Sequence, residues 1–246
     1  MTLRVRPERG LDLAAASFRG VPVAWTTELG EVPGVPGDWW ASWGGGLMTT
    51  CGLDNVGAPS DGRPMHGTYT YLAATDVELE GGEVRGTIAD PRGLTVRRRV
   101  RNAADAGRIV VEDVAVNAAG EPLEAPLLYH CNLRFGPVDI DSVEVVPRDA
   151  DAAAADWREL GSGPERVYEH LGATEAAVEV DGVRVRIRSS LPRLWQWVDP
   201  ERHVVGIEPA NCSVLGAAHD RAEGRLPVLE PGEERRTTLE IELEEL

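Results

Sequence analysis

The sequence predicts an all-β protein, a sandwich or a barrel, and three observations support that class. Segments in which apolar and polar residues alternate recur at short, regular spacing along the 246 residues. Turn-forming pairs such as Gly81-Gly82 and Asp181-Gly182, and the turn at residues 90–93, separate these segments. Residues 148–160 carry the one pattern that is typical of a helix. Many short strands with so little helix indicate packed antiparallel sheets.

The expected strands follow one another without a linker, a repeat or a shift in composition, so we expect a single domain over residues 1–246. The alternation predicts strands over residues 3–6, 15–18, 21–26, 68–73, 76–80, 83–88, 95–100, 108–117, 127–135, 167–170, 176–180, 183–188, 204–208 and 237–246.

A long segment rich in Gly and Pro, residues 31–67, shows little periodicity. A loop of this length inside a compact domain commonly carries function. It contains Trp39, Trp40 and Trp43 and ends at His66-Gly67. Exposed tryptophans are costly, so either the loop folds onto the body of the protein or a ligand covers the rings.

Composition excludes several classes of partner. The 25 basic residues are all Arg, the 41 acidic residues bring the net charge to -16, and no basic stripe offers a surface for nucleic acid. No apolar run reaches the length of a membrane span, and the N-terminus lacks the features of a secretory leader. Three widely spaced cysteines indicate neither a disulfide framework nor a zinc site. We therefore expect a reduced, soluble, cytoplasmic protein.

Two predicted strands place polar side chains among apolar ones. Alternation over residues 127–135 puts His130 and Asn132 on one face, and Tyr129, Cys131 and Leu133 on the other. Cys131 is therefore expected to be a small core residue.

In the second strand Gly206 and Glu208 share a face, which leaves a gap over the backbone that suits the approach of a ligand. Nearby Trp195 and Trp197 could stack on a sugar. A carboxylate in such a pocket becomes a proton acceptor near neutral pH. The alternative is a core tryptophan pair beside a solvated glutamate.

His66, His130 and Glu208 are the candidates for proton transfer, because imidazole and a desolvated carboxyl group titrate near neutral pH. The alternative for each histidine is a satisfied core residue. His170, His203 and His219 are weaker candidates, since turn-like or polar surroundings explain them. Asp54-Asn55 either bind hydroxyl groups or cap a turn.

Several motifs resemble one family. GGGLMTTCGLDNVG (44–57), HG (66–67), LLYHCNLRFG (127–136), LWQWV (194–198), GIEPANC (206–212) and the C-terminal LPVLEPGEERRTTLEIEL (226–243) are similar to segments of the aldose 1-epimerase (galactose mutarotase) superfamily, and more narrowly of a compact bacterial branch. The most specific motifs are CGLDNVG, YH-x-N and G-x-EP-x-NC. The resemblance covers nearly the whole chain.

The resemblance implies a large antiparallel β-supersandwich that interconverts the anomers of a sugar. It implies that His130 is the general acid on the ring oxygen, that Glu208 is the base on the anomeric hydroxyl, and that His66 orients the substrate or assists the acid. An acid and a base positioned across the ring would open the hemiacetal with neither cofactor nor metal. The expected partner is a small-molecule sugar, with no nucleic acid and no membrane, for a monomer or homodimer.

The residues expected to bind the sugar are Asn132, Asp54, Asn55, Trp40, Trp43, Trp197, His170 and Asn211. The family also uses an arginine and an aspartate on sugar hydroxyls, for which Arg63, Arg85, Arg9 and Asp54 are all candidates. Two other functions stay open: a carbohydrate-binding protein without activity, and another sugar-modifying enzyme such as a lyase or hydrolase. The joint presence of His130 and Glu208 favours the isomerase, because a binder needs no matched acid and base.

Overall fold

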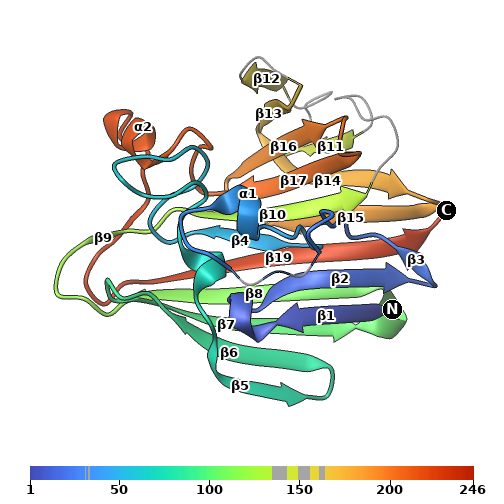
Figure 1. Cartoon of the computed structure of the whole chain (residues 1–246), viewed down its shortest axis with the longest axis horizontal. Helices are drawn as coiled ribbons and strands as arrows, with labels where there is room; N and C mark the ends of the chain where they lie inside the picture. Colours follow the sequence, from blue (N-terminus) through green and yellow to red (C-terminus); the bar gives the residue numbers. More distant parts are fainter. Residues whose placement is uncertain (31, 33, 135–142, 149–155, 161–163) are drawn as a thin grey trace.

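The computed structural model describes residues 1–30, 32, 34–134, 143–148, 156–160 and 164–246. Within these residues, strands build two large sheets and two small ones, and every pairing between named strands for which a register is given is antiparallel (Figure 1). The all-β prediction is confirmed.

The first large sheet, of six strands, carries the candidate site. In spatial order its strands are β12 (Asp156–Leu160), β13 (Arg166–Leu171), β16 (Arg193–Asp199), β17 (Val204–Ala210), β10 (Leu127–Arg134) and β4 (Thr49–Gly52).

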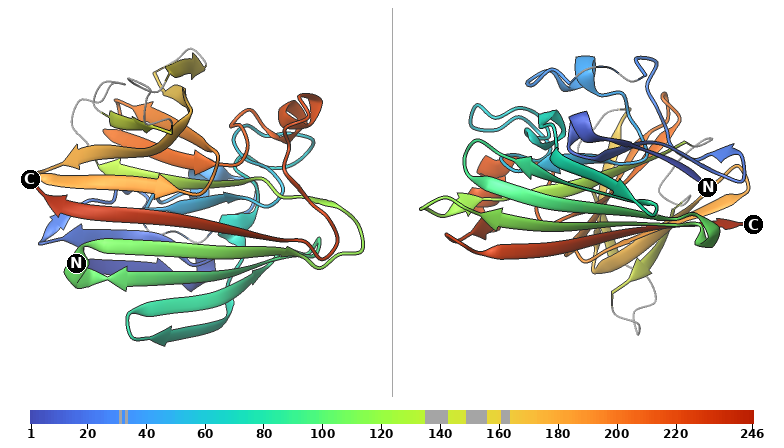
Figure 2. Two further views of the ribbon diagram at one scale, coloured as in Figure 1. Left: turned by 180° about the vertical axis from the view of Figure 1, so that it is seen from behind. Right: turned by 90° about the horizontal axis from the view of Figure 1, so that it is seen from below.

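The second large sheet has eight strands and crosses the molecule behind the first (Figure 2). Its strands in spatial order are β11 (Val143–Pro147), β14 (Ala173–Val180), β15 (Val183–Ser189), β19 (Glu234–Glu245), β8 (Arg108–Asn117), β7 (Leu94–Ala103), β6 (Glu83–Ala89) and β5 (Thr75–Glu80). The small sheets are β1 (Thr2–Arg6), β2 (Asp12–Phe18) and β3 (Val21–Pro22), and the pair β9 (Leu123–Glu124) and β18 (Val228–Leu229). The helices are α1 (Trp39–Ser42) and α2 (Ala217–Ala222), with 3-10 turns at Pro7–Arg9, Tyr69–Tyr71 and Ala104–Ala106.

The main apolar core lies between the two large sheets. Tyr129, Cys131 and Leu133 of β10 face into it, together with Val205 and Ile207 of β17, and all are at most 1 % exposed. Each buried aliphatic side chain of this kind contributes about 1.5–3 kcal/mol to stability. Because side chains alternate along a strand, the residues between these ones face the opposite side of the six-stranded sheet. The predicted division of faces on β10 and the core position of Cys131 are therefore confirmed.

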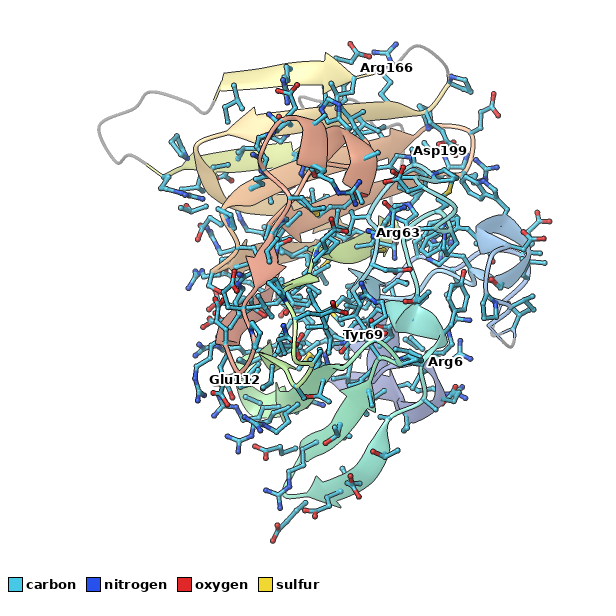
Figure 3. The ribbon with its side chains drawn as sticks, turned by 90° about the vertical axis from the view of Figure 1, so that its left-hand side faces the viewer. Arg6, Arg63, Tyr69, Glu112, Arg166 and Asp199 are labelled. Carbon is cyan, nitrogen blue, oxygen red and sulfur yellow. The ribbon has the colours of Figure 1, made fainter. Side chains whose placement is uncertain are left out.

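A buried ionic cluster fastens the small sheet and both large sheets together. The Arg98 guanidinium is fully buried and donates to both carboxylate oxygens of Asp113, over 2.8 and 2.7 Å, and to the Thr50 hydroxyl over 2.7 Å. It also lies 3.5 Å from Asp12 and 4.8 Å from the ring centre of Tyr69, an interior residue labelled in Figure 3. Planar guanidinium groups suit such two-pronged pairing.

Four local predictions were wrong. Residues 68–73 form no strand and contain the 3-10 turn Tyr69–Tyr71, because Tyr69 and Thr70 are both buried and break the alternation. The strand predicted at 21–26 ends at Pro22 and continues only as isolated bridges at Ala24 and Thr26. The segment 31–67 contains α1 and the fully buried β4, which has no alternation to reveal it. Of the predicted helix, residues 156–160 form β12, while residues 149–155 lie outside the described part of the chain.

No helix in the described ranges is both long enough and apolar enough to cross a membrane.

The buried cluster predicts a contrast between two neighbouring arginines. Replacing Arg98 with Met leaves Asp113 buried without its cation, so the free energy of unfolding should fall by about 3–5 kcal/mol. Arg97→Met is the matched control, because Arg97 is exposed and pairs with Glu234 at the surface, an interaction worth about 0–1 kcal/mol. Urea denaturation measures both. Equal losses in the two variants would contradict the assignment of the cluster as a fastening point.

Candidate active site

Three adjacent strands bring the predicted proton-transfer residues together. In the ladder between β10 and β17, Leu128 pairs with Ala210 and Cys131 with Ile207, which places His130 across from Glu208. On its other side Glu208 pairs with Trp195 of β16. One step along the strands, Gly206 pairs with both Asn132 and Trp197. The side chains of His130, Asn132, Glu208 and the two tryptophans face away from the main core, whereas Cys131 and Ile207 face into it.

His130 and Glu208 form a buried pair. The Nε2 atom of His130 lies 3.1 Å from Oε1 of Glu208, with side chains 5 and 3 % exposed. The distance permits a hydrogen bond, but Glu208 Oε1 has no well-aligned partner among the described residues. Burial raises the pKa of Glu208 to about 8 and lowers the pKa of His130 to about 4. Between these values the pair holds a single proton.

Gly206 provides the space in which the pair stands. A Cβ atom at this position would lie 2.8 Å from Glu208 Oε1 and 3.2 Å from both His130 Cε1 and Trp197 Cε3. The sequence-based expectation of a gap over this glycine is confirmed.

His66 reaches the pair from the loop after β4. Its backbone has φ 59°, which is uncommon for a residue with a side chain, and is fixed by hydrogen bonds from His66 N to Gly57 O and from Gly52 N to His66 O. The ring centre lies 5.6 Å from that of His130 and 4.4 Å from that of Trp39. Burial, and secondarily His130, lower the pKa of His66 to about 3, so the ring is neutral at physiological pH.

Four tryptophans surround the pair. The short helix α1 begins at the Asp38 cap, which accepts a hydrogen bond from Ala41 N, and it carries Trp39 and Trp40. Trp39 and Trp43 are buried and stacked, with ring centres 5.0 Å apart, and Trp43 lies 5.8 Å from Trp197. Trp40 remains 46 % exposed. The loop therefore folds onto the sheet through two of its tryptophans and leaves the third at the surface.

These groups line one open pocket of about 210 Å³. Six of the predicted site residues are part of its wall: His66, His130, Glu208, Trp40, Trp43 and Trp197. The remaining wall is formed by Trp39, Gly57, Ala58, Met65, Glu165, Val167 and Val214.

His170, which was predicted to bind the sugar, is not part of the pocket wall. His170 shares a face of β13 with Tyr168, which belongs to the core between the sheets, and its Nε2 lies 2.8 Å from Oε1 of Gln196. It points to the side of the sheet opposite from the pocket. The sequence alternation of β13 was too short to set the register.

Four other predicted binding residues are absent from the pocket wall, because their side chains bond to backbone groups nearby. Asp54 accepts hydrogen bonds from Thr68, which is the turn-capping alternative. Asn55 donates to Ala58 O and Pro64 O and so fixes the loop that carries His66. Asn211 joins Leu127 N to Ala125 O. Asn132 is fully buried beside His130.

Glu165 is the polar wall residue that the sequence did not indicate. Its carboxylate accepts a hydrogen bond from Trp197 Nε1 over 3.4 Å and another from Arg202 over 3.2 Å. Arg202 in turn lies over the Trp40 ring, 5.2 Å from its centre. The arginine and the aspartate that the family uses on sugar hydroxyls have no counterpart in this wall. It contains none of the four candidates for them, which are Arg9, Arg63, Arg85 and Asp54. No group of three or more His, Cys, Asp or Glu side chains in the described ranges is arranged to hold a metal ion.

The fold is shared with solved structures of sugar epimerase-like proteins. A protein from Klebsiella pneumoniae, provisionally named an aldose 1-epimerase, superimposes with a TM-score of 0.83 at 19% identity, over 99% of this chain and 76% of that chain. Another with the same provisional name, from Escherichia coli K12, gives 0.70 at 15% identity, over 99% and 96%. A galactose mutarotase-like protein from Lactobacillus casei gives 0.68 at 14%, over 98% and 96%. At these identities the likeness shows the fold, which is that of the galactose mutarotase-like proteins.

The family follows from the sequence itself. The model of a family described as Domain of unknown function (DUF4432) matches residues 1–243, so the chain belongs to that family. No curated protein matches the chain.

The crowding around Gly206 predicts that the methyl group of an alanine at this position would push His130 and Glu208 apart. In Gly206→Ala, the added Cβ forces the Glu208 carboxyl group away from His130, and overpacking should lower the free energy of unfolding by about 1–3 kcal/mol. A crystal structure of the variant measures the displacement. Gly120→Ala is the control, since a Cβ there meets no atom within 4 Å. An unchanged contact between Nε2 and Oε1 would contradict this account of Gly206.

The raised pKa of Glu208 predicts a cost in stability at high pH. Below pH 4.5, its ordinary pKa, the carboxyl group is protonated in both states. Between there and about pH 8 the folded protein holds a proton that the unfolded chain has lost, so stability falls as pH rises through this window. Glu208→Gln cannot ionise, and its unfolding free energy should exceed that of the wild type by more than about 1 kcal/mol at pH 9 but not at pH 4.5.

Denaturant titrations at the two pH values measure this difference. Glu80→Gln on the exposed strand β5 is the control, because water already solvates that carboxyl group. A Glu208→Gln variant with no pH-dependent advantage would show that the Glu208 carboxyl group is not desolvated.

Proposed function

We propose that the protein is a sugar mutarotase, which opens and recloses the cyclic hemiacetal of an uncharged monosaccharide. The observation that carries this proposal is the buried pair of His130 and Glu208, 3.1 Å apart, in a pocket walled by tryptophans.

Opening a hemiacetal requires two proton transfers, at the two oxygens that are bonded to the anomeric carbon. Ring opening removes a proton from the anomeric hydroxyl and adds one to the ring oxygen, and rotation about C1–C2 before closure gives the other anomer. His130 and Glu208 stand side by side on neighbouring strands, whereas the resemblance led us to expect an acid and a base across the ring. This arrangement suits the reaction, because both reacting oxygens are bonded to the same carbon. Two side chains that lie next to each other can therefore reach both oxygens. A pair that holds one proton can donate at one oxygen and accept at the other.

The wall of the pocket supports a sugar as the ligand. Tryptophan faces pack on the C–H surfaces of a pyranose, and four are present. A volume of about 210 Å³ is below the roughly 300–1,000 Å³ of sites for drug-sized ligands, which favours a single sugar unit. Glu165 offers a carboxylate to hydroxyl groups. No arginine lines the described wall, and the Glu165 carboxylate there would repel a phosphate or a uronate, so we assign an uncharged substrate.

His66 is assigned a supporting part. Its ring is neutral and contacts both Trp39 and the neighbourhood of His130, so it orients the sugar by a hydrogen bond and adds no charge to the pocket. Asn132, behind His130, acts on the pair and does not touch the sugar.

A carbohydrate-binding protein without activity is the second candidate, and the tryptophan wall alone would serve it equally well. The buried pair of His130 and Glu208 favours the mutarotase over the carbohydrate-binding protein. A binder gains nothing from a desolvated carboxyl group, and burying one without need is costly. A lyase or hydrolase would use the same cleft on a glycoside.

Mutarotation measured on a panel of sugars tests the proposal. Two-dimensional exchange NMR follows the interconversion of anomers of neutral aldoses and ketoses, their phosphates and uronates. The wild type should accelerate the exchange of a neutral sugar, and Glu208→Gln and His130→Asn should each lower kcat by about 10²–10⁴-fold. Glu112→Gln, on the outer side of the eight-stranded sheet, is the control and should retain full activity.

Three results would overturn the proposal in different ways. Binding that survives both substitutions, with no acceleration for any sugar, assigns the pocket to a carbohydrate-binding protein. Release of a reducing end from a glycoside, or an unsaturated product, assigns it to a hydrolase or lyase. Acceleration restricted to sugar phosphates would refute the uncharged substrate. The cytoplasmic location, the single domain, the monomer or homodimer and the exclusion of nucleic acid and membrane remain predictions from sequence.

A further inference from the structure

Asn132 occupies an unusual position behind the candidate pair. It follows His130 by two residues on β10, so both side chains lie on the same face of the strand. It is fully buried, and it is absent from the pocket wall. Its amide contacts His130 and does not reach the pocket wall.

The orientation of the Asn132 amide is fixed by its two donor bonds. Nδ2 donates to Gly46 O over 2.9 Å and to His130 O over 3.0 Å. Turning the amide over would set its oxygen against two carbonyl oxygens, so Oδ1 is the atom left on the free side.

Two buried polar atoms of these neighbouring side chains are left over. Oδ1 of Asn132 and Nδ1 of His130 each have no well-aligned hydrogen-bond partner within the described ranges. The Asn132 side chain is nevertheless close enough to His130 to favour its protonated form. Buried polar groups are normally satisfied, and hydrogen bonds in unliganded sites are often loose and tighten in the complex. An amide oxygen can only accept, so Nδ1 is the donor in a hydrogen bond that joins these two atoms.

From this geometry we infer that Asn132 is a positioning residue that fixes His130 as the Nδ1–H tautomer, so that Nε2 is an acceptor and the proton of the resting pair resides on the Glu208 carboxyl group. The hydrogen bond at one ring nitrogen sets the state of the other. The inference rests on the proposed function for its catalytic meaning, but the tautomer itself does not depend on it.

The remaining groups around the pair agree with this state. The titratable groups that face the His130 ring are Glu208 from β17 and His66 from the loop after β4, and His66 is neutral. The thiols of Cys51 and Cys131 interact with Glu208 electrostatically, and burial raises the pKa of both, so they carry no charge. No cation among these groups stabilises a Glu208 carboxylate.

The order of proton transfers follows. Glu208 donates its proton to the ring oxygen as the C1–O5 bond breaks, with the bonding electrons passing to O5. His130 Nε2 takes the proton of the anomeric hydroxyl as C1=O forms. The pair becomes a carboxylate beside an imidazolium whose Nδ1–H donates to Asn132, and ring closure returns both protons. This reverses the acid and base roles that the family resemblance implies.

Long-range ¹H–¹⁵N NMR of the histidine rings tests the tautomer in the wild-type protein, with His130 assigned from its absence in His130→Asn. At pH 6 we expect a protonated Nδ1 and an unprotonated Nε2. An Nε2–H tautomer, or an imidazolium, would overturn the inference. Because this readout needs no sugar, it can succeed even if the protein proves to be a silent binder, and it can fail even if the protein is an active mutarotase.

Two substitutions of Asn132 show whether the residue positions His130 or only supports the local structure. Asn132→Asp loses the donor bonds to Gly46 O and His130 O but keeps an acceptor for Nδ1–H, whereas Asn132→Leu loses both. We expect Asn132→Leu to mix the tautomers and lower kcat about 10–100-fold with KM changed less than about threefold. Asn132→Asp should keep the tautomer and move the acidic limb of the pH–rate profile upward, because a carboxylate stabilises the imidazolium. Equal impairment of both variants, with the His130 tautomer unchanged in each, would reduce Asn132 to a structural residue.

Discussion

The register between β10 and β17 is the constraint on which the site depends. It sets an imidazole and a carboxyl group across from each other on the face that a tryptophan-bearing loop covers, and so removes both from water. Desolvation then separates their pKa values, with Glu208 holding its proton to about pH 8 and His130 losing its proton at about pH 4. A shift of one residue along either strand would turn one member of the pair into the core and abolish the arrangement.

The same strand that carries His130 is anchored from its other face. Tyr129 points between the sheets, where its hydroxyl group lies 2.8 Å from Asp113 Oδ2 and 2.7 Å from the Thr237 hydroxyl. Asp113 is held in turn by Arg98, so the buried ionic cluster of the eight-stranded sheet fixes the backbone position from which His130 projects. Rigid support from a neighbouring layer is what a preorganised proton-transfer pair requires. Stability and the proposed chemistry are thus divided between the two faces of one strand.

Sequence reasoning predicted the fold and the residues at the centre of the candidate site for physical reasons. Period-2 alternation separates the two faces of each strand, so His130 could be separated from the core residues of β10, and Gly206 and Glu208 from those of β17. That the two polar faces lie on one side of the sheet follows from the strand register. It failed where burial is continuous, as in β4, and where a turn buries consecutive residues, as at Tyr69. His170 was misplaced because β13 is short and its faces are not distinct in composition. Asp54, Asn55 and Asn211 lie outside the pocket wall, because side chains that bond to backbone look the same in sequence as side chains that bind hydroxyl groups. The sequence pattern did not indicate Glu165 as a site residue, because its position beside Trp197 depends on the path of the chain before β13.

A crystal structure with a bound neutral monosaccharide tests the central claim most directly, through the distances from the sugar to His130 Nε2 and Glu208. The account predicts that the ring lies against the tryptophan wall, with its anomeric hydroxyl and its ring oxygen each within hydrogen-bonding distance of one member of the pair. A sugar seated in the pocket with its anomeric carbon turned away from both groups, or bound elsewhere on the protein, would contradict it.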